Sequence, residues 1–333
     1  MAVYTQIDNP ELYFQVKLYT GNGSTQSITF DGDEDMQPDL VWLKGRNHAE
    51  GHFLSDSVRG VNSQLYANQN LAQGTSTTVV TAFGSDGFNI GNYSDINTSS
   101  KTYVAWGWKE SATAGFDIVA YTGDGSAGNT EAHSLSAVPH VMIIKQRNGT
   151  GDWIVYHHKN TSAPETDHLV LHNTAATSDA LNKLNDVAPT SSIFTLGDGG
   201  DTNGSSDTYI NYLFTEKQGF SKFGSYTGNG NADGPFIYTG FRPAMIIIKQ
   251  TNATNRWVIS DNKRDSDNPV VGELNPNDTA VEDTSSTPFD FLSNGFKLRR
   301  TGDVFNTSGY SYIYMAFAEA PFVNSNGVPC NAR

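Results

Sequence analysis

The chain is poor in several features, and each shortage excludes a class of protein. Its 333 residues include one cysteine, Cys330, so no internal disulfide can form, as in a protein made in a reducing cytosol. No apolar run approaches the ~20 residues of a membrane helix, and the N-terminus lacks the basic and apolar regions of a signal peptide. With 21 basic against 35 acidic residues, the net charge of −14 disfavours nucleic acid and anionic lipid as partners.

Glycine, serine, threonine, asparagine and aspartate are abundant, which is typical of short strands joined by polar turns. The motif Tyr-Thr-Gly-Asn/Asp-Gly occurs three times, and each copy is followed by the same landmarks in the same order. These are a proline, an apolar strand ending in lysine (Lys44, Lys145 and Lys249), and a closing strand with tyrosine and glutamate seven residues apart. We therefore predict an all-β chain of three tandem antiparallel β-sandwich repeats at 14–113, 114–218 and 219–320, with an N-terminal arm at 1–13 and a C-terminal tail at 321–333.

The closing strands alternate large and small side chains. In the first repeat, one face carries Val104, Trp106 and Trp108, and the other face carries smaller or more polar residues. A period of two with large apolar groups on one side predicts a strand lying on a core. The same argument makes the tryptophans core residues and not sugar-stacking surfaces.

Three glycines follow Tyr-Thr where the chain has to turn: Gly21, Gly123 and Gly228. Glycine adopts positive φ without steric cost, so we expect these structural turn residues to have positive φ.

The strand before each lysine is apolar at every position, whereas a half-exposed strand should alternate apolar and polar residues. One face can cover the core of its own repeat, and the other face then needs a partner. We predict that the neighbouring repeats or other chains cover it, with Trp42, Ile143 and Ile247 as packing residues. The alternative is a central strand covered by its own loops.

Two groups of residues resemble metal ligands. Six of the eight histidines lie in the second repeat, and His157, His168 and His172 could form a metal site, or could simply be exposed histidines. Asp31, Asp33 and Asp35 alternate as in a calcium loop, but Met36 and Trp42 stand where such a loop needs glycine and glutamate. We therefore predict no metal and no cofactor.

Catalytic motifs are also missing. No pair of carboxylates stands out as a glycosidase pair, no G-x-S-x-G context assembles a serine, histidine and aspartate, and no phosphate-binding loop is present. The sequence therefore predicts a protein without catalytic residues.

Several segments are similar to a known domain: TQIDNPELYFQVKLYTGNG, PDLVWLK, SDSVRG at 55–60, FGSDGFNIG and YVAWGWKE. They resemble a domain of uncharacterised function that recurs in virion proteins of marine tailed phages, although the second and third repeats lack SDSVRG. The resemblance implies a concanavalin-like, jelly-roll sandwich in a tail fibre, capsid appendage or decoration protein, which is assembled in the host cytoplasm and located in the virion.

Such a protein would have other virion proteins and copies of itself as partners. The arm and the tail are candidates for attachment to neighbouring subunits, with frayed termini as the alternative. A carbohydrate- or host-receptor-binding protein that uses the loop ends of the sandwiches, with a host surface glycan as partner, is the alternative function. A glycan-degrading enzyme is a third.

Overall fold

The computed structural model describes residues 5–331, and its strands form one large antiparallel sheet in each repeat. The first sheet contains, in order, β1 (Phe14–Thr20), β9 (Thr102–Trp108), β3 (Leu40–Gly45), β4 (Phe53–Asp56), β5 (Ser63–Tyr66) and β6 (Gly74–Thr75). The second contains β10 (Phe116–Thr122), β17 (Thr208–Phe214), β12 (Val141–Gln146), β13 (Ile154–His157), β14 (Asp167–Val170) and β15 (Ser178–Asp179). The third contains β18 (Ser221–Thr227), β24 (Ser311–Pro321), β20 (Phe241–Gln250) and β21 (Trp257–Asp261).

A smaller sheet accompanies each large one. The three small sheets are β2 (Gln26–Ile28), β8 (Gly87–Ile90) and β7 (Val80–Gly84); β11 (Asn129–Ala132) and β16 (Ile193–Leu196); and β19 (Phe236–Tyr238), β23 (Gly295–Leu298) and β22 (Phe289–Leu292). Helices are short: η1 (Pro10–Leu12), η2 (Pro164–Thr166), α1 (Ser94–Asn97), α2 (Leu181–Leu184), α3 (Gly200–Asn203) and α4 (Asp303–Asn306). The prediction of an all-β protein built from antiparallel sheets in sandwich-like layers is confirmed, whereas the domain boundaries stay a prediction.

The landmark strands have the same register in all three large sheets. In each, the strand that ends in lysine pairs with the closing strand, and the lysine lies opposite the residue that follows the closing tyrosine: Lys44 with Val104, Lys145 with Ile210, and Lys249 with Ile313. The three lysines therefore occupy equivalent positions, as the repeated landmarks predict.

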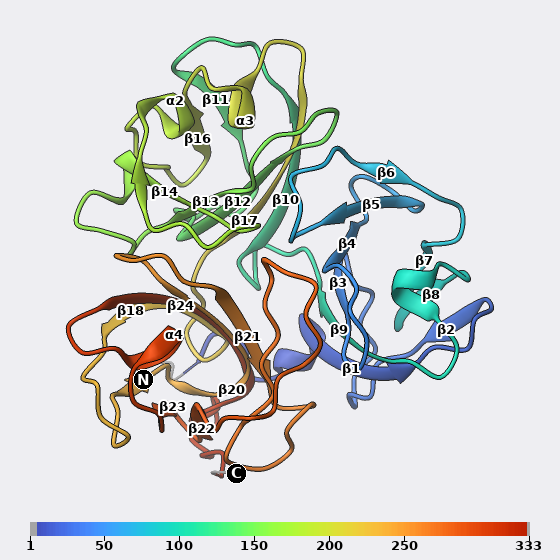
Figure 1. Ribbon diagram of the computed structural model, residues 1–333, viewed down its shortest axis with the longest axis vertical. Helices are drawn as coiled ribbons and strands as arrows, with labels where there is room; N and C mark the ends of the chain where they lie inside the picture. The colour runs from blue at the N-terminus through green and yellow to red at the C-terminus, as the bar shows by residue number, and fades with distance from the viewer. Residues whose placement is uncertain (1–4, 332–333) are drawn as a thin grey trace.

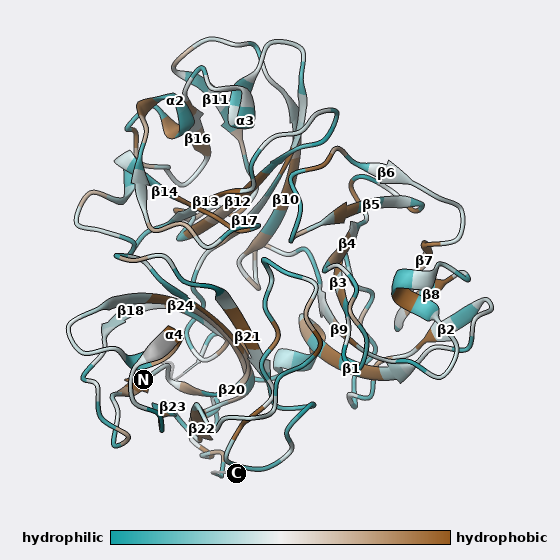
Figure 2. Cartoon of the chain, viewed as in Figure 1, coloured by the Kyte–Doolittle hydropathy of each residue, from teal (hydrophilic) through white to brown (hydrophobic). Residues whose placement is uncertain are grey.

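The two faces of each large sheet serve different cores. In the first repeat, Val41, Leu43, Tyr103 and Ala105 pack with the small sheet, whereas the larger residues of the closing strand point away from it. The large face thus lies on a core, as predicted, but this core is shared with the other repeats. The three lobes lie around a common centre (Figure 1), and the apolar segments concentrate on the sheets while polar residues prevail in the peripheral loops (Figure 2).

Among residues 5–331, none of the helices is long and apolar enough to cross a membrane.

Candidate functional site: the junctions between the three sheets

The centre of the molecule is an apolar cluster to which all three large sheets contribute. Equivalent residues of the three closing strands, Trp108, Phe214 and Phe317, form a triangle. Their ring centroids are 6.5 Å apart for Trp108 and Phe214, 5.5 Å for Trp108 and Phe317, and 5.8 Å for Phe214 and Phe317. The predicted contact between repeats through the outer face of these sheets is therefore present.

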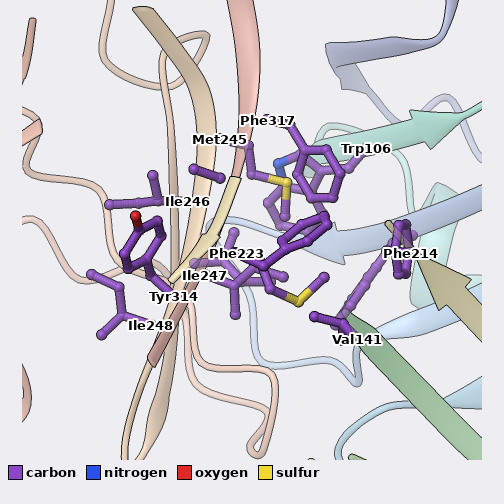
Figure 3. Close-up of a cluster of buried hydrophobic side chains, with 14 of the residues drawn as sticks. Trp106, Val141, Phe214, Phe223, Met245, Ile246, Ile247, Ile248, Tyr314 and Phe317 are labelled. Atoms are coloured by element: carbon purple, nitrogen blue, oxygen red, sulfur yellow. The ribbon is translucent and has the colours of Figure 1, made fainter. Parts of the chain in front are cut away.

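The predicted packing residues meet at the same place. Trp42, Ile143 and Ile247 are buried and line one small cavity of about 20 Å³, together with the aromatic triangle. Figure 3 shows the arrangement around β20: Ile246 and Ile248 lie on one side of the strand, and Ile247 lies on the side that faces Trp106, Val141 and Phe214. The continuous apolar run is explained by this double burial.

A buried ion pair joins the first sheet to the second. Arg59 donates to Asp56 (Nε to Oδ2, 2.5 Å), and the Tyr212 hydroxyl of the second repeat donates to the same Asp56 oxygen at 2.7 Å. Arg59 also binds the Leu54 carbonyl at 3.0 Å, and the side chains of both charged residues are completely buried. Each charge is thus neutralised and hydrogen-bonded, which a buried ion pair requires.

The junction between the third and first sheets repeats this arrangement. Arg264 donates to Asp261 (Nε to Oδ2, 2.6 Å), and the indole of Trp106 in the first repeat donates to the same oxygen at 3.0 Å. The Arg264 guanidinium also lies 5.8 Å from the centroid of the Trp106 ring. The third repeat thus keeps the Ser-Asp-x-x-Arg part of SDSVRG at 260–264, a likeness that the sequence comparison of the repeats missed.

Histidines replace the ion pair at the junction between the second and third sheets. His157 stands at the position of Asp56 and accepts the Lys159 amide on Nδ1 at 3.1 Å, so its proton lies on Nε2 and is donated to the Tyr314 carbonyl at 3.2 Å. Next to it, His158 Nε2 donates to the Phe223 carbonyl at 2.6 Å. Burial lowers the pKa of His157 to about 3, with a further contribution from His158, and burial lowers the pKa of His158 to about 4. Both imidazoles are therefore neutral at pH 7.

Loops close the ring around these junctions with three equivalent backbone hydrogen bonds. Each joins a loop amide to the carbonyl two residues after the strand lysine of the next repeat. The three bonds are Gln73 N to Arg147 O at 2.7 Å, Thr177 N to Thr251 O at 2.8 Å, and Glu282 N to Arg46 O at 2.9 Å. The first repeat therefore binds the second, the second binds the third, and the third binds the first.

Tryptophans beside these bonds reinforce the same contacts. Trp153 Nε1 donates to the Tyr66 and Gln69 carbonyls at 3.0 and 2.9 Å, and Trp257 Nε1 donates to the Val170 carbonyl at 3.0 Å. His52 replaces the tryptophan in the first repeat, and burial holds its pKa well below the usual range.

The three equivalent lysines are buried, and each lies where its strand ends. Each Nζ donates to the next carbonyl along its own chain, over 3.0 Å for Lys44, 2.6 Å for Lys145 and 2.7 Å for Lys249. Lys44 also reaches the Thr279 carbonyl of the third repeat at 3.3 Å, and Lys249 reaches the Thr174 carbonyl of the second at 3.5 Å. Burial lowers the pKa of all three ammonium groups to about 8.

The prediction of positive φ at Gly21, Gly123 and Gly228 is wrong. Positive φ falls instead on the second glycine of each motif, with 70° at Gly23, 74° at Gly125 and 67° at Gly230. The first glycine is needed for close approach. A Cβ would lie 2.3 Å from the Thr98 carbonyl oxygen at Gly21, 2.4 Å from that of Gly204 at Gly123, and 2.3 Å from that of Thr307 at Gly228.

A buried asparagine in each repeat holds this turn, and the motif search missed it. Asn97, Asn203 and Asn306 are fully buried at the ends of α1, α3 and α4. Each accepts the amide of the motif's fourth residue on its side-chain oxygen, over 2.8 to 3.0 Å. Each also donates from Nδ2 to two carbonyls, one just after the motif and one six residues before the asparagine itself. These carbonyls belong to Ser24 and Gly91, to Ser126 and Gly197, and to Asn231 and Arg300. The available signal was the spacing, because each asparagine lies six residues before the closing tyrosine.

The candidate metal ligands do not converge. His157 lies at the junction, His168 is buried on β14, and His172 lies 3.5 Å from Asp152. Asp31, Asp33 and Asp35 are exposed, and Asp31 pairs with Lys17. Among the side chains that the structure describes, no three of His, Cys, Asp or Glu are grouped so that they could hold a metal ion.

The described parts of the arm and tail contact their own chain. The Gln6 amide donates to the Gln218 carbonyl at 3.0 Å, Ile7 is buried in the shared core, and the Ser325 amide donates to Asp8 at 2.7 Å. Residues 1–4 and 332–333, which belong to the predicted attachment segments, lie outside the described residues.

Comparison with known protein families places most of the chain in one of them. Residues 9–321 match the family described as "Domain of unknown function (DUF7483)". No curated protein and no solved structure matches the chain.

Proposed function

The chain belongs to the DUF7483 family, and we propose that it is a structural building block of a virion, as a tail fibre, capsid appendage or decoration protein. The observation that carries the proposal is the closed ring of junctions. Three sheets share one core, and the buried lysines, Arg59 and His157 direct N–H groups to main-chain carbonyls of the chain itself. Such use of buried polar groups favours a rigid scaffold whose role is to assemble and to present a surface.

The virion assignment takes its support from the resemblance of the first repeat, from TQIDNPELYFQVKLYTGNG to YVAWGWKE, to phage virion domains. Other virion proteins and copies of this chain are the partners that this role requires. The role needs no catalytic centre and no cofactor.

Mass spectrometry of purified particles, combined with immunogold electron microscopy, tests the proposal. We expect the chain in a fixed number of copies per particle and a label at one location. A chain abundant in the infected cell but absent from washed particles would contradict the proposal. So would release of reducing sugar from host glycans by the pure protein, if one Asp or Glu substitution abolished that release.

A further inference from the structure

The edge strand β19 carries an aromatic pair that the other repeats lack. Phe236 is 45% exposed and Tyr238 is 59% exposed, on either side of the buried Ile237. Ile237 pairs with Phe296 as Ile28 pairs with Phe88, so the two aromatic positions correspond to Ser27 and Thr29 in the first repeat. In the second repeat they correspond to Thr130 and Ala132. Fold alone therefore does not require aromatic residues here.

Tyr238 borders a surface cleft between the second and third repeats. The cleft has a volume of about 430 Å³, which is within the ~300–1,000 Å³ range of small-molecule sites. Its lining includes His140 and Glu216 of the second repeat and Lys222, Tyr238, Thr239 and Gly240 of the third. The cleft thus offers an aromatic ring together with charged and polar groups.

The polar groups of the cleft are held in place by contacts with one another and with the main chain. Lys222 Nζ lies 2.7 Å from Glu216 Oε2, and the Phe223 amide donates to Glu216 Oε1 at 2.8 Å. The Glu216 amide donates to His140 Nδ1 at 3.0 Å, which leaves the imidazole proton on Nε2. These groups present hydrogen-bond donors and acceptors whose charges balance, so the site favours a neutral polar ligand over an anion.

A sugar ring matches both kinds of group in this cleft. A pyranose has an apolar C–H face, which stacks on an aromatic ring, and a rim of hydroxyl groups, which both donate and accept hydrogen bonds. We propose that this cleft binds one neutral hexopyranose unit of a glycan, stacked on Tyr238 with its hydroxyl groups toward His140, Glu216 and Lys222. The site lies where loops and strand ends of the second and third repeats meet, and it does not depend on the assembly role.

Binding of neutral trisaccharides to the full-length protein tests the proposal, with maltotriose, cellotriose and chitotriose as probes. Saturation-transfer NMR and calorimetric titration should detect at least one of them. Tyr238→Thr, which installs the residue of the first repeat, should weaken that binding about tenfold or more, because it removes the stacking surface. Tyr238→Trp should retain it. Tyr238 is exposed, so thermal unfolding should be unchanged in both variants and a loss of binding would not reflect misfolding.

Two matched controls locate the ligand. Phe236→Ser removes the other exposed aromatic residue of β19, which does not line the cleft, and Thr29→Ala alters the position in the first repeat that corresponds to Tyr238. Both variants should bind as tightly as the native protein. The proposal is overturned if none of the three probes binds, if Tyr238→Thr binds normally, or if Phe236→Ser loses as much affinity as Tyr238→Thr.

Discussion

At the scale of single residues, the recurring Tyr-Thr-Gly motif is explained by a contact and not by a dihedral angle. Its tyrosine stacks on the closing tyrosine with ring centroids 5.0, 5.0 and 4.9 Å apart in the three repeats. Its first glycine lies against a main-chain carbonyl, and its fourth residue binds the buried asparagine. Each residue of the motif thus has a partner about eighty residues further along the chain, near the closing strand.

A methyl group at the first glycine should therefore be costly. In Gly123→Ala the new Cβ would lie 2.4 Å from the Gly204 oxygen, so backbone must move, and we expect the free energy of unfolding to fall by about 2–3 kcal/mol. Gly84→Ala is the matched control, because its Cβ would meet nothing nearer than 3.5 Å, and it should change stability by less than about 0.5 kcal/mol. Urea unfolding measures both, and equal stability of the two variants would contradict the close-approach explanation.

At the scale of elements, the strands could be predicted from sequence, but which face of each strand packs on the small sheet and which on the shared core could not. The alternation of large and small side chains identifies the closing strands β9, β17 and β24 from sequence. The apolar run before each lysine identifies β3, β12 and β20. Both faces of these sheets are apolar, however, so hydropathy cannot tell which face meets the small sheet. Local pattern likewise cannot distinguish a glycine needed for positive φ from one needed for close approach, which explains the error at Gly21.

The end of β13 makes one junction sensitive to acid. His157 and His158 have pKa values near 3 and 4 in the folded chain, and near 6.5 when unfolded. Because the unfolded chain binds more protons below pH 6.5, their contribution to stability is complete above that pH and is lost as the pH falls toward 4. We expect a loss of about 2 kcal/mol at pH 5 for the fully buried His157 and a smaller loss for the partly buried His158, measured by urea unfolding between pH 7.5 and 4.5.

His157→Gln isolates this effect, since glutamine can still donate to the Tyr314 carbonyl but does not titrate. Its stability should fall less steeply with acid than that of the native chain. If the native chain and this variant have the same pH profile, the junction histidine is not the cause.

At the scale of the whole molecule, the junctions predict that a single repeat is incomplete. Residues 1–113 alone would expose Trp42, Trp106 and Trp108, which the other two repeats cover in the full chain. Buried apolar surface contributes about 25 cal/mol per Å², so the fragment should aggregate, self-associate or lose much of its stability. Light scattering and thermal unfolding of the fragment and the full chain measure this, and a soluble monomer as stable as the full chain would refute it.

The sequence predicted that the repeats touch but not how they close. The order in which each repeat binds the next depends on pairs such as Asp56 with Tyr212 and Asp261 with Trp106, which lie more than 150 residues apart. Such pairs leave no local pattern. The surface cleft is hidden for the same reason, because it combines residues of two repeats.

The replacement of an ion pair by histidines at one junction has a mechanical consequence. In a trimer of identical chains, all three seams would be alike and would yield together. Here the three repeats are covalently joined, so each seam can carry its own chemistry. Two neutral imidazoles replace the ion pair between the second and third repeats, whereas the seam between the third and first repeats has the buried His52 in addition to its ion pair. Mild acid therefore loads the three seams unequally, and we expect the seam between the second and third repeats to weaken first, because it has two imidazoles to charge and no buried ion pair.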